Sequence, residues 1–403
     1  MSKNWIILLI LLQLTFACSS TPVKQAKTDV DSSSQEDQVI LGNEKLAQYL
    51  PMLNGKRVGF VGNHTSIIGK THLVDSLLTL GVKVVKVFSP EHGFRGTADA
   101  GEKVGNEVDQ KTGLSIISLY GKNKKPSAEQ LNGVDVIVFD IQDVGARFYT
   151  YISTLHYVME AAAEQGIAVV VLDRPNPNGH YVDGPILEEK YKSFVGMHPV
   201  PVVHGMTIGE YAQMINGEKW LKKGVHCELT VITCENYSHQ KEYTVNVPPS
   251  PNLPNMNAIY LYPSLCFFEG TPISIGRGTD APFQQFGHPA FSEFSYSFTP
   301  TPTPGAKSPK LNGKECFGVD LTNQEIVNLR NWRKLDLSYL INSYKMYPEK
   351  EKYFTNFFNL LAGNSSLKEA IKAGKTESEI RAAWAEDLAI FKEIRSRYLL
   401  YAE

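Results

Sequence analysis

The sequence predicts an α/β protein built on a parallel, doubly wound sheet. The first observation is a set of short runs rich in β-branched residues, which are typical of strands buried on both faces. The second is that helical patterns lie between these runs, so that strand, helix and strand alternate along the chain. The runs are Arg57–Gly62, Val82–Phe88, Val134–Phe139 and Ile167–Leu172.

Two amphipathic helices are expected between these strands. Lys70–Leu80 lies between the first two strands and Ser153–Gln165 between the last two, and each carries apolar residues on one face. Gly81 and Gly166 follow directly and provide the usual helix stop.

Four segments are predicted from composition. Residues 1–18 are a signal peptide, residues 19–42 a disordered tether, residues 43–252 the sheet domain and residues 253–403 a second domain. The boundary follows from Pro249–Pro254, which continues neither a strand nor a helix. Within the second domain, Pro300–Pro309 is expected to be a surface loop, and the last third is expected to be helical. Four residues at helical spacing are expected core contacts there: Trp384, Leu388, Phe391 and Tyr398.

The N-terminus predicts export. Lys3 precedes an uncharged apolar run, Trp5–Ala17, which has the length of a signal-peptide core and is too short for a membrane span. Ala17 followed by Cys18 is similar to a bacterial lipobox, although Thr15 stands where Leu is usual. We therefore expect Cys18 to be acylated, giving a lipoprotein anchored in the periplasm or at the outer membrane. The alternative is ordinary cleavage near Ala17 that leaves a free thiol.

Composition and cysteine spacing exclude some functions. The formal net charge is −2 and there is no basic stretch, so no nucleic-acid partner is expected. Cys227, Cys234, Cys266 and Cys316 match no zinc or redox motif. A Cys227–Cys234 bridge and four free thiols are both compatible with the sequence.

Polar residues cluster where the predicted strands end. The loops are Asn63–Ser66, Ser89–Gly96, Asp140–Tyr151 and Asp173–Gly179. Since ligands of open parallel sheets bind at the carboxyl edge, we expect these loops to form one site. The alternative is that their Asn, Asp, Pro and Gly residues only build turns.

Several familiar chemistries are not indicated. No G-x-G-x-x-G, G-x-x-x-x-G-K-[ST], G-x-S-x-G or H-E-x-x-H motif occurs. Glu91, His92, Asp140, Asp143 and His204 have the right groups for metal ligands. We nevertheless expect no metal ion at these residues. We expect their side chains to hydrogen-bond one another and the substrate instead.

Carboxylate chemistry remains. Glu91 follows a buried strand, where desolvation raises the pKa of a carboxylic acid and lets it donate a proton near neutrality. Glycoside hydrolysis needs such an acid and usually a second carboxyl group. Asp140, Asp143 and Glu269 are candidates for the second role, or structural groups, and His92 is expected to orient Glu91.

Other polar residues are candidates for substrate binding. Arg147, Arg174 and Arg277 have the geometry to clamp an anionic group, or to donate to backbone carbonyls. Tyr149 and Tyr151 are suited to stacking on a sugar ring, or to packing the loop.

These loops carry a family resemblance over about residues 45–403. The sequence resembles the exo-β-N-acetylmuramidase (NamZ-type) glycosidases, formerly a domain family of unknown function. The motifs are NHTS (63–66), SPEHGFRG (89–96), DIQDVGARFYTY (140–151), LDRPNPNG (172–179), VHGMTIGE (203–210), PSPNLP (249–254) and FEGTPISIGRGTD (268–280).

The resemblance implies a Rossmann-like N-terminal domain and a smaller C-terminal α/β domain, with no cofactor. It implies release of N-acetylmuramic acid from the non-reducing end of peptidoglycan fragments, including muropeptides, in cell-wall recycling. Glu91 matches the family's proposed catalytic glutamate. Asn63, His204 and Glu269 lie in the matching motifs and are expected to bind substrate.

Two points stay open in the sequence. The 2-acetamido group of the sugar can itself act as nucleophile, and Asp140 and Asp143 would then only polarise it. The competing functions are a sugar-binding lipoprotein without catalysis and a metal-dependent hydrolase of another bond.

Overall fold

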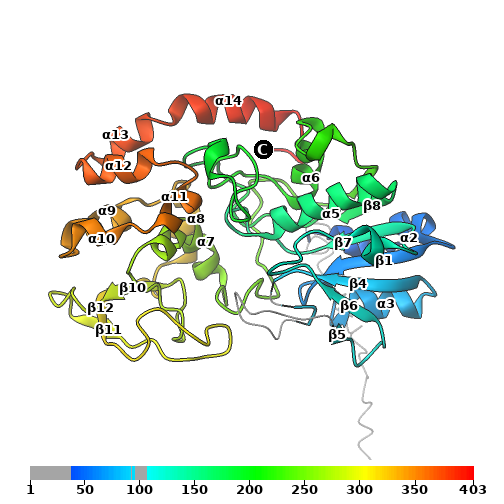
Figure 1. Ribbon diagram of the computed structural model, residues 1–403, viewed down its shortest axis with the longest axis horizontal. Helices are drawn as coiled ribbons and strands as arrows, with labels where there is room; N and C mark the ends of the chain where they lie inside the picture. Colours follow the sequence, from blue (N-terminus) through cyan, green and yellow to red (C-terminus); the bar gives the residue numbers. More distant parts are fainter. Residues whose placement is uncertain (1–37, 92, 96–106) are drawn as a thin grey trace, which may run out of the picture. The chain divides into compact units, whose positions relative to one another are not determined.

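Seven strands form the central sheet of the protein (Figure 1). The structure is a computed structural model that describes residues 38–91, 93–95 and 107–403. The strand order is β5-β6-β4-β1-β7-β8-β9, and only β5 runs antiparallel to its neighbour. The strands are β1 (Arg57–Gly62), β4 (Lys83–Ser89), β5 (Glu107–Val108), β6 (Ser115–Ser118), β7 (Val136–Asp140), β8 (Ala168–Leu172) and β9 (Leu229–Ile232).

The six parallel strands, numbered in chain order, lie in the sheet in the order 3-2-1-4-5-6. This is the Rossmann arrangement, in which the order reverses between the first and fourth strands. The predicted doubly wound, mostly parallel sheet is therefore confirmed, and the four predicted strands end within a residue or two of β1, β4, β7 and β8. β6 and β9 were not predicted, because their four-residue runs are too short to stand out.

Helices cover both faces of the sheet because its strands are apolar on both sides. In β7, Val136 and Val138 face one core cluster with α2 (Leu46–Leu53) and α3 (Leu73–Thr79). Ile137 and Phe139 face the other cluster, which contains α5 (Tyr151–Gln165) and α6 (Ile208–Gly217). This alternation is the period of two that a strand imposes.

The helix expected at Lys70–Leu80 is shorter in the structure. A small hairpin of β2 (Ile67–Ile68) and β3 (Thr71–His72) takes up its predicted first turn. His72 then caps α3, because its ring nitrogen accepts the backbone N–H of Val74.

The C-terminal part combines helices with a small sheet of order β10-β12-β11, as the predicted smaller α/β part requires. Trp384 and Phe391 are buried, and Leu388 and Tyr398 pack against the same core, which confirms their predicted role. Its elements are β10 (Gln285–His288), β11 (Tyr296–Phe298), β12 (Cys316–Asp320), α7 (Met256–Leu265), the 3-10 helix η4 (Cys266–Gly270), α8 (Ile326–Trp332), α9 (Ser338–Met346), α10 (Lys350–Tyr353), α11 (Asn356–Ala362), α12 (Ser366–Lys372), α13 (Glu377–Ala382) and α14 (Ala385–Ser396).

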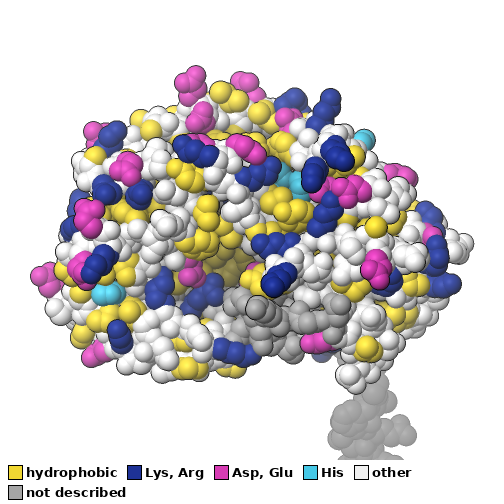
Figure 2. Space-filling view, in the orientation of Figure 1, with side chains coloured by type: hydrophobic (Ala, Val, Ile, Leu, Met, Phe, Trp, Pro, Cys, Tyr) yellow, Lys and Arg dark blue, Asp and Glu magenta, His cyan; other side chains and the backbone are white. Residues whose placement is uncertain are grey.

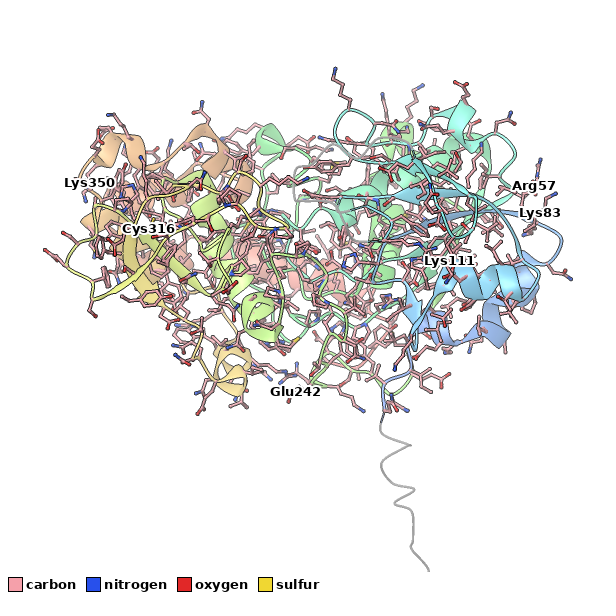
Figure 3. The ribbon with its side chains drawn as sticks, turned by 90° about the horizontal axis from the view of Figure 1, so that it is seen from below. Arg57, Lys83, Lys111, Glu242, Cys316 and Lys350 are labelled. Atoms are coloured by element: carbon pink, nitrogen blue, oxygen red, sulfur yellow. The ribbon has the colours of Figure 1, made fainter. Side chains whose placement is uncertain are left out.

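Residues Val39–Glu403 form one compact unit. Seen from below, Cys316 and Lys350 lie toward one end of it and Arg57 and Lys83 toward the other (Figure 3). The end of the chain returns to the sheet, where the Tyr401 hydroxyl bonds Asp173 just after β8. The predicted domain boundary after residue 252 stays a prediction.

The signal peptide, the lipidation site Cys18, nearly all of the tether and the candidate residue His92 lie outside the described residues. The remaining four cysteines are buried free thiols, which selects that alternative over a Cys227–Cys234 bridge. No described helix is long and apolar enough to cross a membrane.

Candidate active site

A cavity of about 740 Å³ lies between the loops that follow β4 and β6 and the C-terminal part. Figure 2 shows a hollow on this face, with an apolar floor and basic side chains at its rim. Five of the predicted site residues line the cavity: Glu91, Tyr149, Tyr151, Glu269 and Arg277.

Strand register brings Glu91 beside Tyr120. Ser89 of β4 pairs with Ser118 of the parallel strand β6, and the chain continues two residues from each to Glu91 and Tyr120. The Tyr120 hydroxyl lies beside the Glu91 carboxylate. Burial raises the pKa of Tyr120 and the nearby charge of Glu91 raises it further, so the phenol keeps its proton.

A second hydroxyl reaches Glu91 from the start of α5. Thr150 occupies the N-cap position but makes no capping hydrogen bond with its side chain. Instead, Thr150 Oγ1 donates to Glu91 Oε2 at 3.2 Å. Glu91 is thus held by two neutral hydroxyl groups from two different elements.

Glu269 and Arg277, which come from the C-terminal part of the chain, form an ion pair in the cavity lining. Arg277 Nε lies 2.7 Å from Glu269 Oε1, and the two side chains are 29% and 24% exposed. Gly276 and Gly278 flank Arg277 with φ of 76° and 80°, which side-chain-bearing residues rarely adopt. This Gly-Arg-Gly turn presents the guanidinium to the cavity. Burial alone would lower the pKa of Arg277, but the charge of Glu269, with a smaller effect of Glu91, raises it.

The charges of the lining are unequal. Glu91 and Glu269 contribute two negative charges, and Arg277, Lys307 and Lys310 three positive ones, which leaves an excess of one positive charge. Lys310 Nζ donates to backbone carbonyls of η4 and the residue after it, and its burial lowers its pKa.

Lys310 and Lys307 belong to the segment that was expected to be a surface loop. Residues 305–310 form a wall of the cavity, and Ala306 and Pro309 are buried. Pro300–Pro309 is a loop with exposed residues, as expected, and its second half also lines the cavity.

Tyr149 and Tyr151 are fixed parts of the cavity wall. Both hydroxyls donate to the carbonyl of Pro249, at 2.8 Å and 3.2 Å. Asn63 Nδ2, from the loop after β1, in turn donates to the Tyr151 hydroxyl at 2.9 Å. Asn63 itself is fully buried, so its place is behind the wall and not in the cavity.

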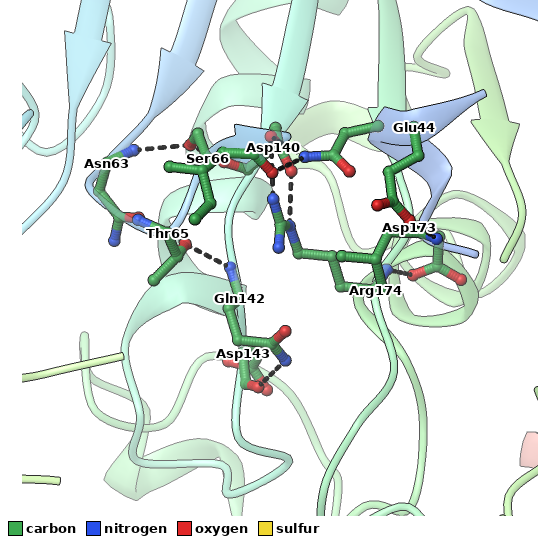
Figure 4. Close-up of polar contacts among 12 residues, drawn as sticks. Glu44, Asn63, Thr65, Ser66, Asp140, Gln142, Asp143, Asp173 and Arg174 are labelled. Atoms are coloured by element: carbon green, nitrogen blue, oxygen red, sulfur yellow. Dashed lines mark hydrogen bonds and ion pairs between the residues drawn. The ribbon is translucent and has the colours of Figure 1, made fainter. Parts of the chain in front are cut away.

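The switch point of the sheet is filled by a buried ion pair. Arg174 donates to both carboxylate oxygens of Asp140, at 2.6 Å and 3.1 Å (Figure 4). Asn43 adds a third donor to the same carboxylate. Asp140 and Arg174 are 0% and 4% exposed, and neither is among the residues that line the cavity, so the two side chains satisfy each other in the interior.

Three further candidates also lie away from the cavity lining. Arg147 donates to the carbonyls of Pro185, Val200 and Leu361, which ties the sheet part to α11. Asp143 and His204 lie 3.9 Å apart in the interior. Burial raises the pKa of Asp143 to about 7 and lowers that of His204 to about 3, so His204 is neutral near pH 7 while Asp143 gains or loses its proton there.

The four strand-end loops therefore do not converge on one site. Glu91, just after β4, lines the cavity, as do Tyr149 and Tyr151, whereas the loops after β1 and β8 and the start of the loop after β7 form the buried network behind it. In the described part of the chain, no three His, Cys, Asp or Glu side chains are grouped so as to hold a metal ion.

Four residues of the cavity lining were not among the predicted site residues: Tyr120, Thr150, Lys307 and Lys310. The same strand-end rule would have found Tyr120 if the strand before it had been recognised. Thr150 stands between two predicted residues in the motif 149–151. The two lysines carry no local signal.

Comparisons with known proteins agree with this architecture. Residues 58–257 match the family described as exo-beta-N-acetylmuramidase NamZ, N-terminal, and residues 260–401 match its C-terminal counterpart. A relative named peptidoglycan beta-N-acetylmuramidase NamZ, from Bacillus subtilis (strain 168), is 39% identical over 88% of this chain and 89% of its own length.

Two solved structures from Bacteroides fragilis NCTC 9343 share the fold. One DUF1343 family protein superposes with a TM-score of 0.85 at 49% identity, covering 91% of this chain and 99% of its own. A second gives a TM-score of 0.76 at 30% identity with the same coverage. The predicted resemblance is thereby confirmed, and the chain belongs to the exo-β-N-acetylmuramidase NamZ family.

Proposed function

We propose that this protein is an exo-acting glycosidase that releases N-acetylmuramic acid from the non-reducing end of peptidoglycan fragments. The observation that carries the proposal is the pair of carboxylates, Glu91 and Glu269, in one cavity of a NamZ family member. The curated relative from Bacillus subtilis is named for the same activity on peptidoglycan.

The partners of the two carboxylates support different roles. Glu91 is held by the hydroxyls of Tyr120 and Thr150, which can accept as well as donate and so accommodate a protonated acid. Glu269 faces the guanidinium of Arg277, which can only donate and so needs an acceptor. We assign proton donation to the glycosidic oxygen to Glu91, and the role of second carboxylate to Glu269.

The charge of the cavity suits the substrate. N-acetylmuramic acid carries a carboxylate on its lactyl group, and the lining sets three cations against two carboxyl groups, of which Glu91 is neutral when it acts as the proton donor. Arg277 provides a planar donor for such a group, as expected from the sequence, while it also positions Glu269.

Incubation with a purified MurNAc-GlcNAc disaccharide tests the function. We expect free N-acetylmuramic acid, at the same rate with and without a chelator. Binding without cleavage would identify a sugar-binding protein instead. Cleavage that a chelator abolishes and a divalent ion restores would identify a metal-dependent hydrolase.

Replacing Glu269 by Gln should lower kcat for this disaccharide by about 10²–10³-fold, because a carboxylate near the reacting carbon is lost. The Gln side chain keeps the size of Glu269, so KM should change far less than kcat. The measurement is the initial rate of N-acetylmuramic acid release.

Glu293→Gln is the matched control for this prediction. Glu293 lies exposed in the C-terminal part and outside the cavity lining, so its variant should match the wild type. A Glu269→Gln enzyme with wild-type kcat would remove Glu269 from the chemistry.

We also propose that Cys18 is acylated and anchors the protein in the periplasm or at the outer membrane, where it would serve cell-wall recycling. The apolar run Trp5–Ala17 followed by Cys18 supports this. Cells fed a labelled fatty acid should label the wild-type protein and not a Cys18→Ala variant. Equal labelling of the two proteins would contradict the anchor.

A further inference from the structure

Phe357 stands apart among the exposed apolar side chains. Eight large hydrophobic residues are exposed in the described part of the chain, and Phe357, at 39%, is the one among them that lines the cavity. The other aromatic residues of the lining include Tyr149 at 7% and Phe283 at 1%. Phe357 therefore belongs to the mouth of the cavity, and the buried rings to its floor.

The position of Phe357 is fixed relative to Glu269. The backbone N–H and hydroxyl of Thr355 both donate to the carbonyl of Gly270, each at 3.0 Å. A Cβ on Gly270 would lie 2.5 Å from the Cα of Phe358, so the two backbones touch. Phe358 is buried in the core, which turns its neighbour Phe357 outward to the cavity.

Phe357 continues into an apolar wall. Leu361 lies one turn further along α11 and also lines the cavity, as do Phe194 and Val195 from the segment before Gly196. A Cβ on Gly196 would lie 3.7 Å from the carbonyl of Leu360, which places that segment against α11.

The two phenyl rings of this wall differ in what already contacts them. The Phe194 ring stacks with the Tyr157 ring at a distance of 6.2 Å between ring centres, and Lys124 Nζ lies 4.4 Å from the centre of the Phe194 ring. No described aromatic ring or cation lies over the Phe357 ring. Phe357 thus presents an exposed aromatic face at the mouth of the cavity.

We propose that Phe357 is the platform on which the leaving sugar stacks, so that it determines preference for a sugar on the reducing side of the cleaved bond. This inference rests on the proposed function. In an exo-acting enzyme the terminal sugar fills the inner part of the cavity, and the part of the substrate that extends to the mouth is the leaving group. A pyranose ring offers a C–H face that an exposed aromatic ring binds.

The experiment compares two substrates that differ only in the leaving group. One is the MurNAc-GlcNAc disaccharide, and the other is the methyl β-glycoside of N-acetylmuramic acid. Phe357→Ala should raise KM for the disaccharide about tenfold, as expected for one lost aromatic stacking contact. The kcat/KM for the methyl glycoside should change by less than about twofold, since that substrate has no ring to stack. Phe357→Trp should retain the wild-type preference.

Trp332→Ala is the matched control, because Trp332 is an exposed aromatic residue, 45% accessible, outside the lining. It should leave both substrates unaffected. An equal loss on both substrates in Phe357→Ala, or no loss on either, would overturn the platform.

A wild-type enzyme that cleaves neither substrate would overturn the proposed function separately. Calorimetric titration with the disaccharide then tests whether Phe357 serves as the stacking platform. Weaker binding to Phe357→Ala than to the wild type supports the platform, and equal binding overturns it.

Discussion

Replacing Glu91 by Gln is expected to lower kcat for N-acetylmuramic acid release by about 10²–10⁴-fold, the usual contribution of a general acid. Gln has the size of Glu and keeps an oxygen for the hydroxyls of Tyr120 and Thr150. Its amide is too weakly acidic to transfer a proton to the glycosidic oxygen. The loss should therefore appear in kcat, with little change in KM.

The choice of leaving group separates the possible roles of Glu91. A nitrophenyl glycoside of N-acetylmuramic acid departs without protonation, so Glu91→Gln should retain most of its activity on this substrate if Glu91 is the acid. An equally large loss on both substrates would assign Glu91 to the reacting carbon and leave the acid role to Glu269. Full activity on the disaccharide would remove Glu91 from catalysis altogether.

Glu189→Gln serves as the control for Glu91. The Glu189 side chain is 80% exposed and lies outside the cavity lining, so this variant should keep the wild-type rate. Unchanged circular dichroism of Glu91→Gln would show that its loss of activity is chemical.

The sheet was predictable because its signal is local. Strands buried on both faces must be apolar at consecutive positions, and this pattern is visible in β1, β4, β7 and β8 without knowledge of their neighbours. β6 and β9 have only four residues each, so the apolar strand pattern is short in both. A run of that length is equally compatible with a helix turn or a loop.

The site was only partly predictable. The rule that ligands bind at the carboxyl ends of parallel strands identifies the edge of the sheet, but it does not say which way each side chain points. It selected Glu91, which lines the cavity. It selected Asp140 and Arg174 for the same reason, but these two satisfy each other in the interior. Whether two polar groups face a ligand or one another depends on packing. Phe357 comes from a helix more than 250 residues after Glu91 in the chain, and no local pattern marks it.

Removal of the Asp140 carboxylate should destabilise the protein strongly. In Asp140→Ala, Arg174 would stay buried with its charge uncompensated, and such a loss lowers the free energy of unfolding by about 3–5 kcal/mol. The surface pair of Arg57 and Asp135 provides the control, because its side chains are 47% and 37% exposed. Asp135→Ala should change stability little, since exposed pairs are screened by water. Urea denaturation of the two variants measures both effects.

The double variant Asp140→Leu/Arg174→Met distinguishes a structural pair from a catalytic Asp140. If the two groups serve mainly each other, removing both charges should recover much of the stability lost in the single variant. Because the cavity lining contains neither residue, kcat per folded molecule should stay within a few-fold of wild type. A double variant that folds stably and yet loses kcat as completely as Glu91→Gln would return Asp140 to the catalytic role that the sequence suggested. The Rossmann switch point would then be part of the active site, whereas a stable and active double variant would leave catalysis to the cavity beyond β4 and β6.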